Sequence, residues 1–456
     1  MQIIVNSKIK IRKDEVSDQL LRWISKRLRF NNPEYKSAMQ GGKQARWAAR
    51  NIPRFIFGYR ITEDYVIMDR GVLIPLTNYL YENDVEFSID NKTISKKHEI
   101  RLNNIKLRDY QQRAVQRSLR QRGGVVIQPC GGGKTITLLG MLKELQETTL
   151  IFVHTTFLLN QWVQYIKDFL GYDAGIIQGE TEDIKPITVC MIQTLYNRKI
   201  TKQFAEQWGC VIVDEAHHVP ANMFRSIVSK FPARYRFGAS ATVNRSDSLT
   251  QMIFSILGPR CYRISSSRLS ELGYIRIPTV MLRETEFTSN GGNFSSIVKQ
   301  LISNEDRNQL IISDLANNQG RFNLVLSSRI EHLKKLASLY SQHSEDYEVV
   351  IGDVKSSKRE EIINRMRCGQ LHTIFATQLA DEGLDIPILD TLYLAFPTKA
   401  KGRIEQRVGR IQRIADGKSS PLVYDYSDNW VTSLFRQSQV RVQLYQELEL
   451  NISNGN

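Results

Sequence analysis

The sequence predicts an α/β protein in which two tandem blocks of parallel strands and flanking helices follow a small basic α+β domain. From Ile105 onward, short runs of β-branched and other apolar residues alternate with longer helical segments. The alternation pauses at the polar, glycine-containing segment 288–293 and then resumes. Buried parallel strands connected by helices have this pattern. We therefore place the domains at 1–105, 106–285 and 286–456.

The expected elements follow in chain order. In the first domain we expect a helix over 16–28 and strands over 65–68 and 71–75. The apolar runs that predict buried strands of the first α/β block are 124–127, 150–153, 187–192 and 210–213. Those of the second block are 322–326, 347–351, 373–376, 391–394 and 422–424. A closing helix is expected over 432–452.

Composition places the chain among globular proteins and excludes several classes. Its 456 residues leave room for about three domains, and 41% of them are hydrophobic. No apolar run approaches the roughly 18 residues of a membrane span, and the N-terminal segment lacks the apolar core of a signal peptide. The five cysteines form no CxxC pair, which argues against a disulfide framework and a structural zinc site. We expect a cytoplasmic protein, in the host cell cytoplasm if it is viral.

The positive charge is concentrated at the N-terminus. The net charge is +15, and residues 1–60 hold 14 Lys and Arg against 4 Asp and Glu. Residues 61–105 hold 5 basic residues against 8 acidic ones. A basic module of this kind favours a polyanionic partner, because neutralising phosphates releases condensed counterions. The alternative is a solvated basic face that only aids solubility.

The strongest local signal is a glycine-rich segment, Gln128-Pro-Cys-Gly-Gly-Gly-Lys-Thr135, directly after the apolar run 125–127. Glycines let backbone N–H groups turn inward toward a phosphate, and the N-terminus of the following helix adds its dipole. Lys134 would contact the β- and γ-phosphates, and Thr135 would bind Mg²⁺. The residues expected to hold the nucleotide here are Gly131, Gly132, Gly133, Lys134 and Thr135. The usual pattern has Gly or Ala at its first position, where this chain has Gln128.

An acidic pair follows a buried strand about eighty residues later, in Asp214-Glu-Ala-His217. A carboxylate at the end of a strand beside a phosphate loop is well placed to organise magnesium. Asp214 would therefore share the metal with Thr135, and Glu215 would orient and activate the attacking water. A helix cap would also explain two adjacent acids. We expect His217 to couple the two blocks rather than to bind metal.

The order of these motifs resembles that of superfamily 2 helicases of the DEAH type, over residues 105 to about 430. The resemblance implies that Gln111, in Leu107-Arg-Asp-Tyr-Gln111, contacts the adenine. In Ile151-Phe-Val-His-Thr155 and Met191-Ile-Gln-Thr194, it implies that the residues touching the tracked strand are Thr155, Gln193 and Thr194. It further implies that the residues coupling ATP to nucleic acid are His217, Ser240 and Thr242.

The second block carries the later motifs of the same family. The resemblance implies that Arg329 and Thr377 contact nucleic acid and that Gly383 and Asp385 face the nucleotide. The segment Gln406-Arg-Val-Gly-Arg-Ile-Gln-Arg413 resembles the arginine-finger motif, whose catalytic residues would be Gln406, Arg410 and Arg413. Independently of the family, residues 410 and 413 would share one face of a helix. Two guanidiniums there could stabilise negative charge on a transferring phosphoryl group.

The family resemblance implies two RecA-like domains that bind ATP and Mg²⁺, close by a hinge motion and step along DNA as a monomeric motor. Within the superfamily the chain most resembles the branch-migration group of UvsW-type, RecG-type and XPB-like enzymes. Basic residues of the first domain are candidate contacts to duplex backbone: Lys26, Arg27, Arg29, Lys43, Arg46 and Arg50. Aromatic residues that would be either a strand-separating wedge or the domain's core are Trp23, Phe30, Trp47 and Phe55.

Three functions remain open from the sequence. The first is a DNA translocase that remodels forks, Holliday junctions or displacement loops in recombination, repair or replication. The second is an RNA helicase, in which an Asp-Glu-Ala-His tetrapeptide also occurs. The third is an inactive scaffold or the motor part of a DNA-processing complex such as a restriction system. The complete set Lys134, Glu215, Arg410 and Arg413 argues against an inactive chain.

Overall fold

The structure is a computed structural model that describes residues 1–40, 47, 49–100, 105–216, 221–241, 249–352, 356–377, 386–399 and 401–455. Contacts divide the chain into two units. The first comprises Met1–Gln128 and Gly133–Ile264, and the second comprises Pro129–Gly132 and Ser265–Asn456. The basic N-terminal region therefore belongs to the same unit as the first α/β block.

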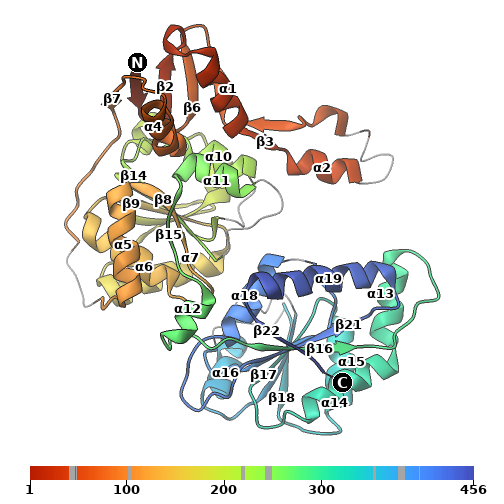
Figure 1. The fold of residues 1–456 in the computed structure, drawn as a ribbon. Coiled ribbons are helices and arrows are strands. Elements are labelled where there is room, and N and C mark those ends of the chain that lie inside the picture. The colour runs from red at the N-terminus through yellow and green to blue at the C-terminus, as the bar shows by residue number, and fades with distance from the viewer. Residues whose placement is uncertain are drawn as a thin grey trace. The chain divides into compact units, whose positions relative to one another are not determined.

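The N-terminal region folds as a five-stranded sheet with two main helices (Figure 1). Its strands, in the sheet order β5-β6-β2-β1-β7, are Tyr59–Ile61, Tyr65–Asp69, Lys8–Arg12, Gln2–Val5 and Ser88–Asn91. The expected helix is confirmed as α1, Asp18–Arg27, whose first turn is capped by the Ser17 hydroxyl. A lesser helix and a two-stranded ribbon lie outside the sheet: α2 Pro33–Gln40, β3 Arg29–Asn31 and β4 Phe55–Phe57.

The strand expected at 71–75 is wrong. Arg70–Val72 forms a short 3-10 helix, η3, and Leu73–Glu82 forms helix α4. Pro75 lies in the first turn of α4, where its missing N–H costs no hydrogen bond. Val72, Leu76 and Leu80 are buried at helical spacing. Three apolar residues in a row followed by proline fit a strand equally well, so only the packing decides.

The first α/β block is an eight-stranded sheet that is parallel except at one edge, where β10 and β11 pair antiparallel. In the sheet order β11-β10-β12-β9-β13-β14-β8-β15, the strands are Thr181–Asp183, Gly175–Gln178, Ile187–Met191, Thr149–Val153, Cys210–Val213, Tyr235–Ser240, Gly123–Ile127 and Arg260–Arg263. The four expected strands are confirmed, and β10, β11, β14 and β15 are additional.

Helices cover both faces of this sheet because alternate strand residues point in opposite directions. Val126 and Ile151 face α5, α6 and α7, whereas Val125 and Ile127 face α8 to α11. The helix bounds are α5 Asp109–Gln121, α6 Lys134–Leu145, α7 Thr156–Leu170, α8 Ile192–Tyr196, α9 Lys202–Ala205, α10 Ala221–Val228 and α11 Leu249–Leu257. The core on the α8 to α11 side of the sheet continues into the N-terminal sheet through residues such as Met68.

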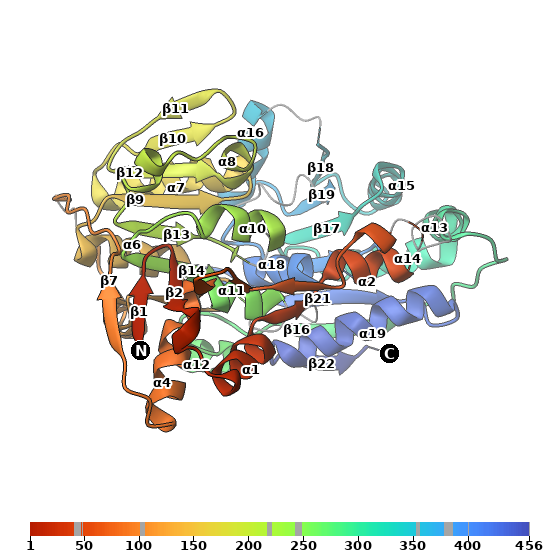
Figure 2. The ribbon, with the colours of Figure 1, turned by 90° about the horizontal axis from the view of Figure 1, so that it is seen from above.

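The second unit contains a seven-stranded, fully parallel sheet with helices on both faces (Figures 1 and 2). In the sheet order β18-β19-β17-β20-β21-β16-β22, the strands are Tyr347–Val350, Thr373–Thr377, Asn323–Ser327, Thr391–Leu394, Leu422–Ser427, Thr279–Glu284 and Asn451–Asn454. Its longer helices are α13 Phe294–Ser303, α14 Glu305–Ala316, α15 Ile330–Tyr340, α16 Ser356–Arg367, α18 Lys401–Ile411 and α19 Thr432–Glu447, and a short one is α12 Ser266–Glu271. α16, α18 and α19 pack on one face, and α14 and α15 pack on the other.

Two expectations for this unit are corrected. The closing helix ends at Glu447, because Glu449 takes a left-handed φ of 58° and the chain then adds strand β22 beside β16. The strand β16, which the boundary at 285 assigns to the first block, belongs to the second sheet. No helix within the described residues combines the length and the apolar character needed to cross a membrane.

Candidate nucleotide-binding and active site

The loop between β8 and α6 has the backbone of a phosphate cradle. Gly131 and Gly133 have φ angles of 76° and 69°, in the left-handed region that glycine adopts without strain. Gly132 is buried, and its N–H closes a turn inside the loop. Lys134 and Thr135 form the start of α6, where N–H groups and the helix dipole favour a bound phosphate. The predicted cradle residues therefore follow one another through a single turn.

Two buried glutamines brace this loop. Gln128 donates from Nε2 to Thr137 Oγ1 at 3.0 Å, which ties the start of the loop to α6. Gln111 donates from Nε2 to the carbonyl of Gly133 at 3.3 Å and accepts from the N–H of Arg108 at 2.9 Å. The usual Gly or Ala at position 128 could not form the first bond, so the departure from the motif supports the loop. The contact of Gln111 with adenine stays a prediction.

The acidic pair lies at the end of β13, beside the same loop. Asp214 is buried and accepts a hydrogen bond from Trp162 Nε1 at 2.8 Å. Lys134 Nζ lies 2.8 Å from Glu215 Oε1. Glu215 has a φ of 45°, a left-handed conformation that costs energy in a residue other than glycine. The structure thus brings Lys134, Asp214 and Glu215 together, as expected from the motifs.

Trp162 is a positioning residue to which motif reading gave no role at the acidic pair. It lies on α7 and is fully buried, with its indole N–H directed at Asp214. The two residues are 52 positions apart in the chain. A buried indole N–H usually finds a partner, but the sequence does not say which one.

The environment of Asp214 disfavours its charge. Burial, and then repulsion from Glu215, raise the pKa of Asp214 from 3.8 to about 6, although the Trp162 donor and the Lys134 cation oppose the shift. A buried carboxylate that is costly to ionise gains from a nearby cation. The Thr135 hydroxyl and this carboxylate are oxygen donors of the kind that magnesium takes alongside phosphate oxygens. When bound, the ion neutralises charge on the transferring phosphoryl group.

We predict that Asp214→Asn stabilises the nucleotide-free protein at pH 8. A carboxyl group with a raised pKa in the folded chain favours folding when protonated, so its contribution is lost as the pH rises from 3.8 to about 6. Removing the charge should raise the free energy of unfolding at pH 8 by on the order of 2 kcal/mol. Urea denaturation at several pH values measures this gain, which should disappear toward pH 4.

The control for this prediction is Asp168→Asn, which removes an exposed carboxylate from α7 and should bring no gain. A stability change of Asp214→Asn that does not depend on pH would contradict the role given to the buried charge. So would a loss of stability at pH 8.

The residues predicted to contact the tracked DNA strand follow the carboxyl ends of β-strands in the first α/β sheet. The phosphate loop lies at the same edge of this sheet. The hydroxyl of Thr155 caps α7. Gln193 donates from Nε2 to the carbonyl of His154 at 3.0 Å, and the hydroxyl of Thr194 accepts a backbone N–H at 3.1 Å. Ser240 ends β14, where its carbonyl accepts the N–H of the loop's first residue at 3.1 Å. Their contacts with nucleic acid stay predictions.

In the second unit, the predicted nucleic-acid contacts also follow strand ends. Arg329 is exposed at the N-cap of α15. Thr377 ends β19, and its buried hydroxyl has no hydrogen-bond partner in the described part of the chain. The described residues therefore supply no hydrogen-bond partner for either side chain.

The arginine-finger segment departs from the expected geometry in one respect. Gln406 and Arg410 are half-buried and lie one turn apart on α18. The helix ends at Ile411, so Arg413 lies beyond it and pairs through its backbone with Ile275 in an antiparallel bridge. The expectation that residues 410 and 413 share a helical face is therefore wrong. Their catalytic roles stay predictions.

The basic residues of the N-terminal region cluster near the end of α1. Lys26, Arg27 and Arg29 are exposed, as is Arg50. Among the aromatic residues, Phe30 is core and Trp23 packs partly buried against it, whereas Trp47 is 69% exposed. Phe55 is half-buried beneath the guanidinium of Arg29. The predicted site residues that lie outside the described residues are Lys43, Arg46, His217, Thr242, Gly383 and Asp385.

A glycine-rich loop at a strand end, with a lysine and an acidic pair beside it, defines a P-loop nucleoside triphosphatase on a RecA-like sheet. The family described as "Type III restriction enzyme, res subunit" matches residues 104–245. The family described as "Helicase conserved C-terminal domain" matches residues 305–415. The chain belongs to the superfamily 2 helicases and is an ATP-driven helicase.

Individual relatives agree with this family. The chain is 26% identical over 384 residues to the DNA 3'-5' translocase XPB2 of Sulfurisphaera tokodaii, a match that covers 74% of this chain and 85% of the relative. It is 28% identical over 350 residues to a protein of Acanthamoeba polyphaga mimivirus named as an ATP-dependent RNA helicase, covering 72% and 65%. The fold is similar to the restriction-modification enzyme LlaBIII bound to DNA, with a TM-score of 0.57, 15% identity and coverage of 83% and 34%.

Proposed function

We propose that the protein is an ATP-driven DNA translocase that remodels branched DNA, by regressing forks or by migrating Holliday junctions and displacement loops. The observation that carries this proposal is the packing of a basic N-terminal region against the ATPase block within one unit. DNA held by Lys26, Arg27 and Arg29 would move together with the start of α6 and the acidic pair, which belong to the same unit. A duplex grip joined to a motor in this way suits junction migration better than simple tracking.

The proposed chemistry uses the residues already described. Lys134 holds the β- and γ-phosphates of ATP, and Glu215 orients water toward the γ-phosphate. Thr155, Gln193 and Thr377 contact the backbone of one strand, so that nucleotide-dependent movement shifts that strand. The name of the archaeal relative, a 3'-5' translocase, supports the same direction of travel here.

The proposal is tested by comparing substrates of equal length. We expect ATP turnover to rise with single-stranded and branched DNA, and a four-way junction to be migrated faster than a plain duplex is unwound. The matched variants are Arg27→Gln, in the basic cluster, and Arg22→Gln, at another exposed arginine of the same helix. Unwinding of the plain duplex at the higher rate, with no junction processing, would contradict the proposal.

An RNA helicase is the second candidate, because the mimivirus relative carries that name. The same panel separates the two functions. Stimulation of ATP turnover by RNA alone would replace the first proposal with the second. No ATP turnover with any nucleic acid would leave the scaffold or accessory-motor alternative.

A further inference from the structure

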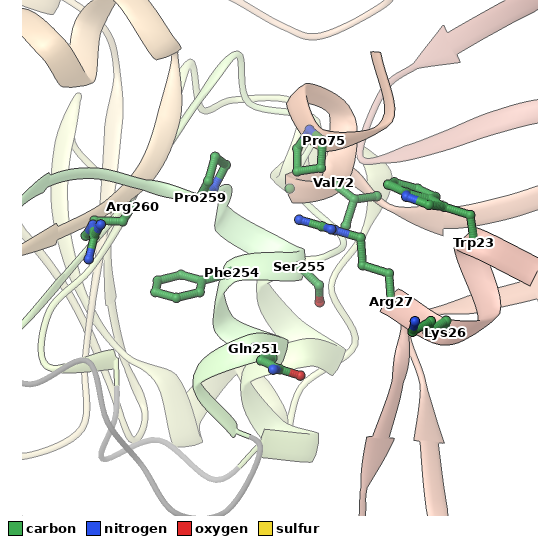
Figure 3. A pocket seen from close by; sticks show the side chains of 11 residues that line it. Trp23, Lys26, Arg27, Val72, Pro75, Gln251, Phe254, Ser255, Pro259 and Arg260 are labelled. Carbon is green, nitrogen blue, oxygen red and sulfur yellow. The ribbon is translucent and has the colours of Figure 1, made fainter. Parts of the chain in front are cut away.

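A pocket of about 710 Å³ opens where the N-terminal region meets the first α/β block (Figure 3). This volume lies in the range of small-ligand pockets, roughly 300–1,000 Å³. One wall is the end of α1, another is η3 with α4, and the third is α11 with the start of β15. The described residues that line it are Trp23, Lys26, Arg27, Gly71, Val72, Pro75, Gln251, Phe254, Ser255, Pro259 and Arg260.

The walls of this pocket are held in place by close packing. A Cβ atom on Gly71 would lie 2.4 Å from the carbonyl oxygen of Phe254, so η3 touches the backbone of α11 where no side chain fits. Buried Asp69 accepts from the Ser255 hydroxyl at 3.2 Å and pairs with Lys8. The Arg236 guanidinium donates to the carbonyl of Ser7 at 2.9 Å. The pocket is therefore built into the first unit.

The charge of the pocket is entirely positive. Its lining includes Lys26, Arg27 and Arg260 but no Asp or Glu. None of these three cations has an ion-pair partner within the described ranges, and all three are exposed. Arg27 extends from α1 toward α11 in Figure 3. Cations that are unpaired in the protein and face one opening favour a phosphate-bearing ligand.

The apolar part of the lining favours a ligand that has a flat ring. The Trp23 ring already has two partners, Tyr79, whose ring centroid lies 4.9 Å away, and the guanidinium of Arg27, 5.3 Å from the ring centroid. Phe254 is half-buried and has no ring partner within the described residues. Gln251 is exposed beside it, and an amide can both donate to and accept from the edge of a base.

We infer that this pocket, called the junction pocket, binds one unpaired nucleotide of the DNA substrate, with its base on Phe254 and its phosphates at Arg27 and Arg260. The inference rests on the proposed function. A base in a continuous duplex must be unstacked and unpaired before it can enter, whereas strand exchange at a migrating branch point unpairs bases in passing. The helix that carries Phe254 follows the Ser240 segment in the chain, with only residues 241–248 between them.

The test uses the full chain and a duplex with a single extra adenine, compared with the same duplex carrying an abasic residue there. Stacking of a base on an aromatic ring is strong enough that the adenine should tighten binding by about 5- to 100-fold. Phe254→Ala should remove that preference. Arg27→Gln and Arg260→Gln should each lower the slope of log affinity against log salt by about one. The matched controls, Arg22→Gln and Arg263→Gln, remove exposed charges from the same elements and should change neither quantity.

A second measurement does not depend on the folding of a variant. In the wild-type chain, 5-iodouracil at the unpaired position should crosslink to residues 23–27 or 251–260. Crosslinks confined to other parts of the chain would overturn the inference, and so would equal affinity for the adenine and abasic duplexes. If free deoxyadenosine monophosphate protected the residues of the pocket as well as DNA does, the ligand would not be a nucleotide within a DNA strand. If DNA stimulates ATP turnover but shows no single-base preference, only the junction pocket fails; if DNA neither binds nor stimulates, the proposed function fails.

Discussion

Glu215→Gln is expected to lower DNA-stimulated ATP turnover by about 10²- to 10⁴-fold, the usual contribution of a positioned general base. Glutamine keeps the size and the hydrogen-bonding oxygen of the side chain but cannot accept the proton of the attacking water. It also frees Lys134 from its ion pair with Glu215, so nucleotide affinity should be retained or increased. Turnover and the affinity for a fluorescent ATP analogue measure the two effects separately.

The matched control is Glu144→Gln, which removes an exposed carboxylate from α6, the helix that begins with Lys134. It should leave both turnover and affinity unchanged. Near-normal turnover in Glu215→Gln would remove Glu215 from the water-activating role. A parallel loss of nucleotide affinity would instead assign it to binding.

Arg413→Ala is expected to lower turnover by about 10³-fold or more, the contribution typical of an arginine finger, while nucleotide binding persists. The backbone of Arg413 is held on two sides, by its bridge to Ile275 and by Lys418 Nζ, which donates to its carbonyl at 2.8 Å. Because these contacts fix the backbone at Arg413, its side chain starts from a fixed position. Truncating the side chain should therefore remove the charge without disturbing α18. Single-turnover hydrolysis, with nucleotide affinity measured alongside, checks the prediction.

The comparison variant for this prediction is Arg403→Ala, an exposed arginine on α18. It should retain most of the turnover. If Arg413→Ala hydrolysed ATP at nearly the normal rate, the finger assignment would be wrong, and Arg410 would become the candidate to test.

Most strands of the two α/β sheets could be predicted because buried parallel strands are continuous apolar runs. The exceptions have physical causes. β14 includes Arg236 and Gly238 within its run, which breaks the apolar pattern although the arginine is fully buried. The edge strand β11 is exposed along its whole length and carries two carboxylates, so it lacks the apolar residues that indicate a buried strand. At 71–75, an apolar run ending in proline suits a strand and a helix start alike.

The candidate site was predictable where its chemistry lies within a few consecutive residues. The phosphate loop and the acidic pair are of this kind, because a turn and a strand end place their own neighbours. Trp162 and the junction pocket are different. Phe254 and Arg260 lie more than 220 residues from Trp23 in the chain, and only tertiary packing places them around one opening. Residues of this kind carry no local signature.

The continuous core shared by the N-terminal sheet and the helicase sheet limits how this molecule can be altered. Cutting the chain at residue 105 would leave the part of this core that N-terminal residues such as Met68 cover facing water. An exposed apolar patch of this sort promotes association between copies. A different substrate-recognition region could replace the present one only if it brought an apolar surface that covers the same part of the core. Substrate selectivity and solubility therefore cannot be changed independently in this protein.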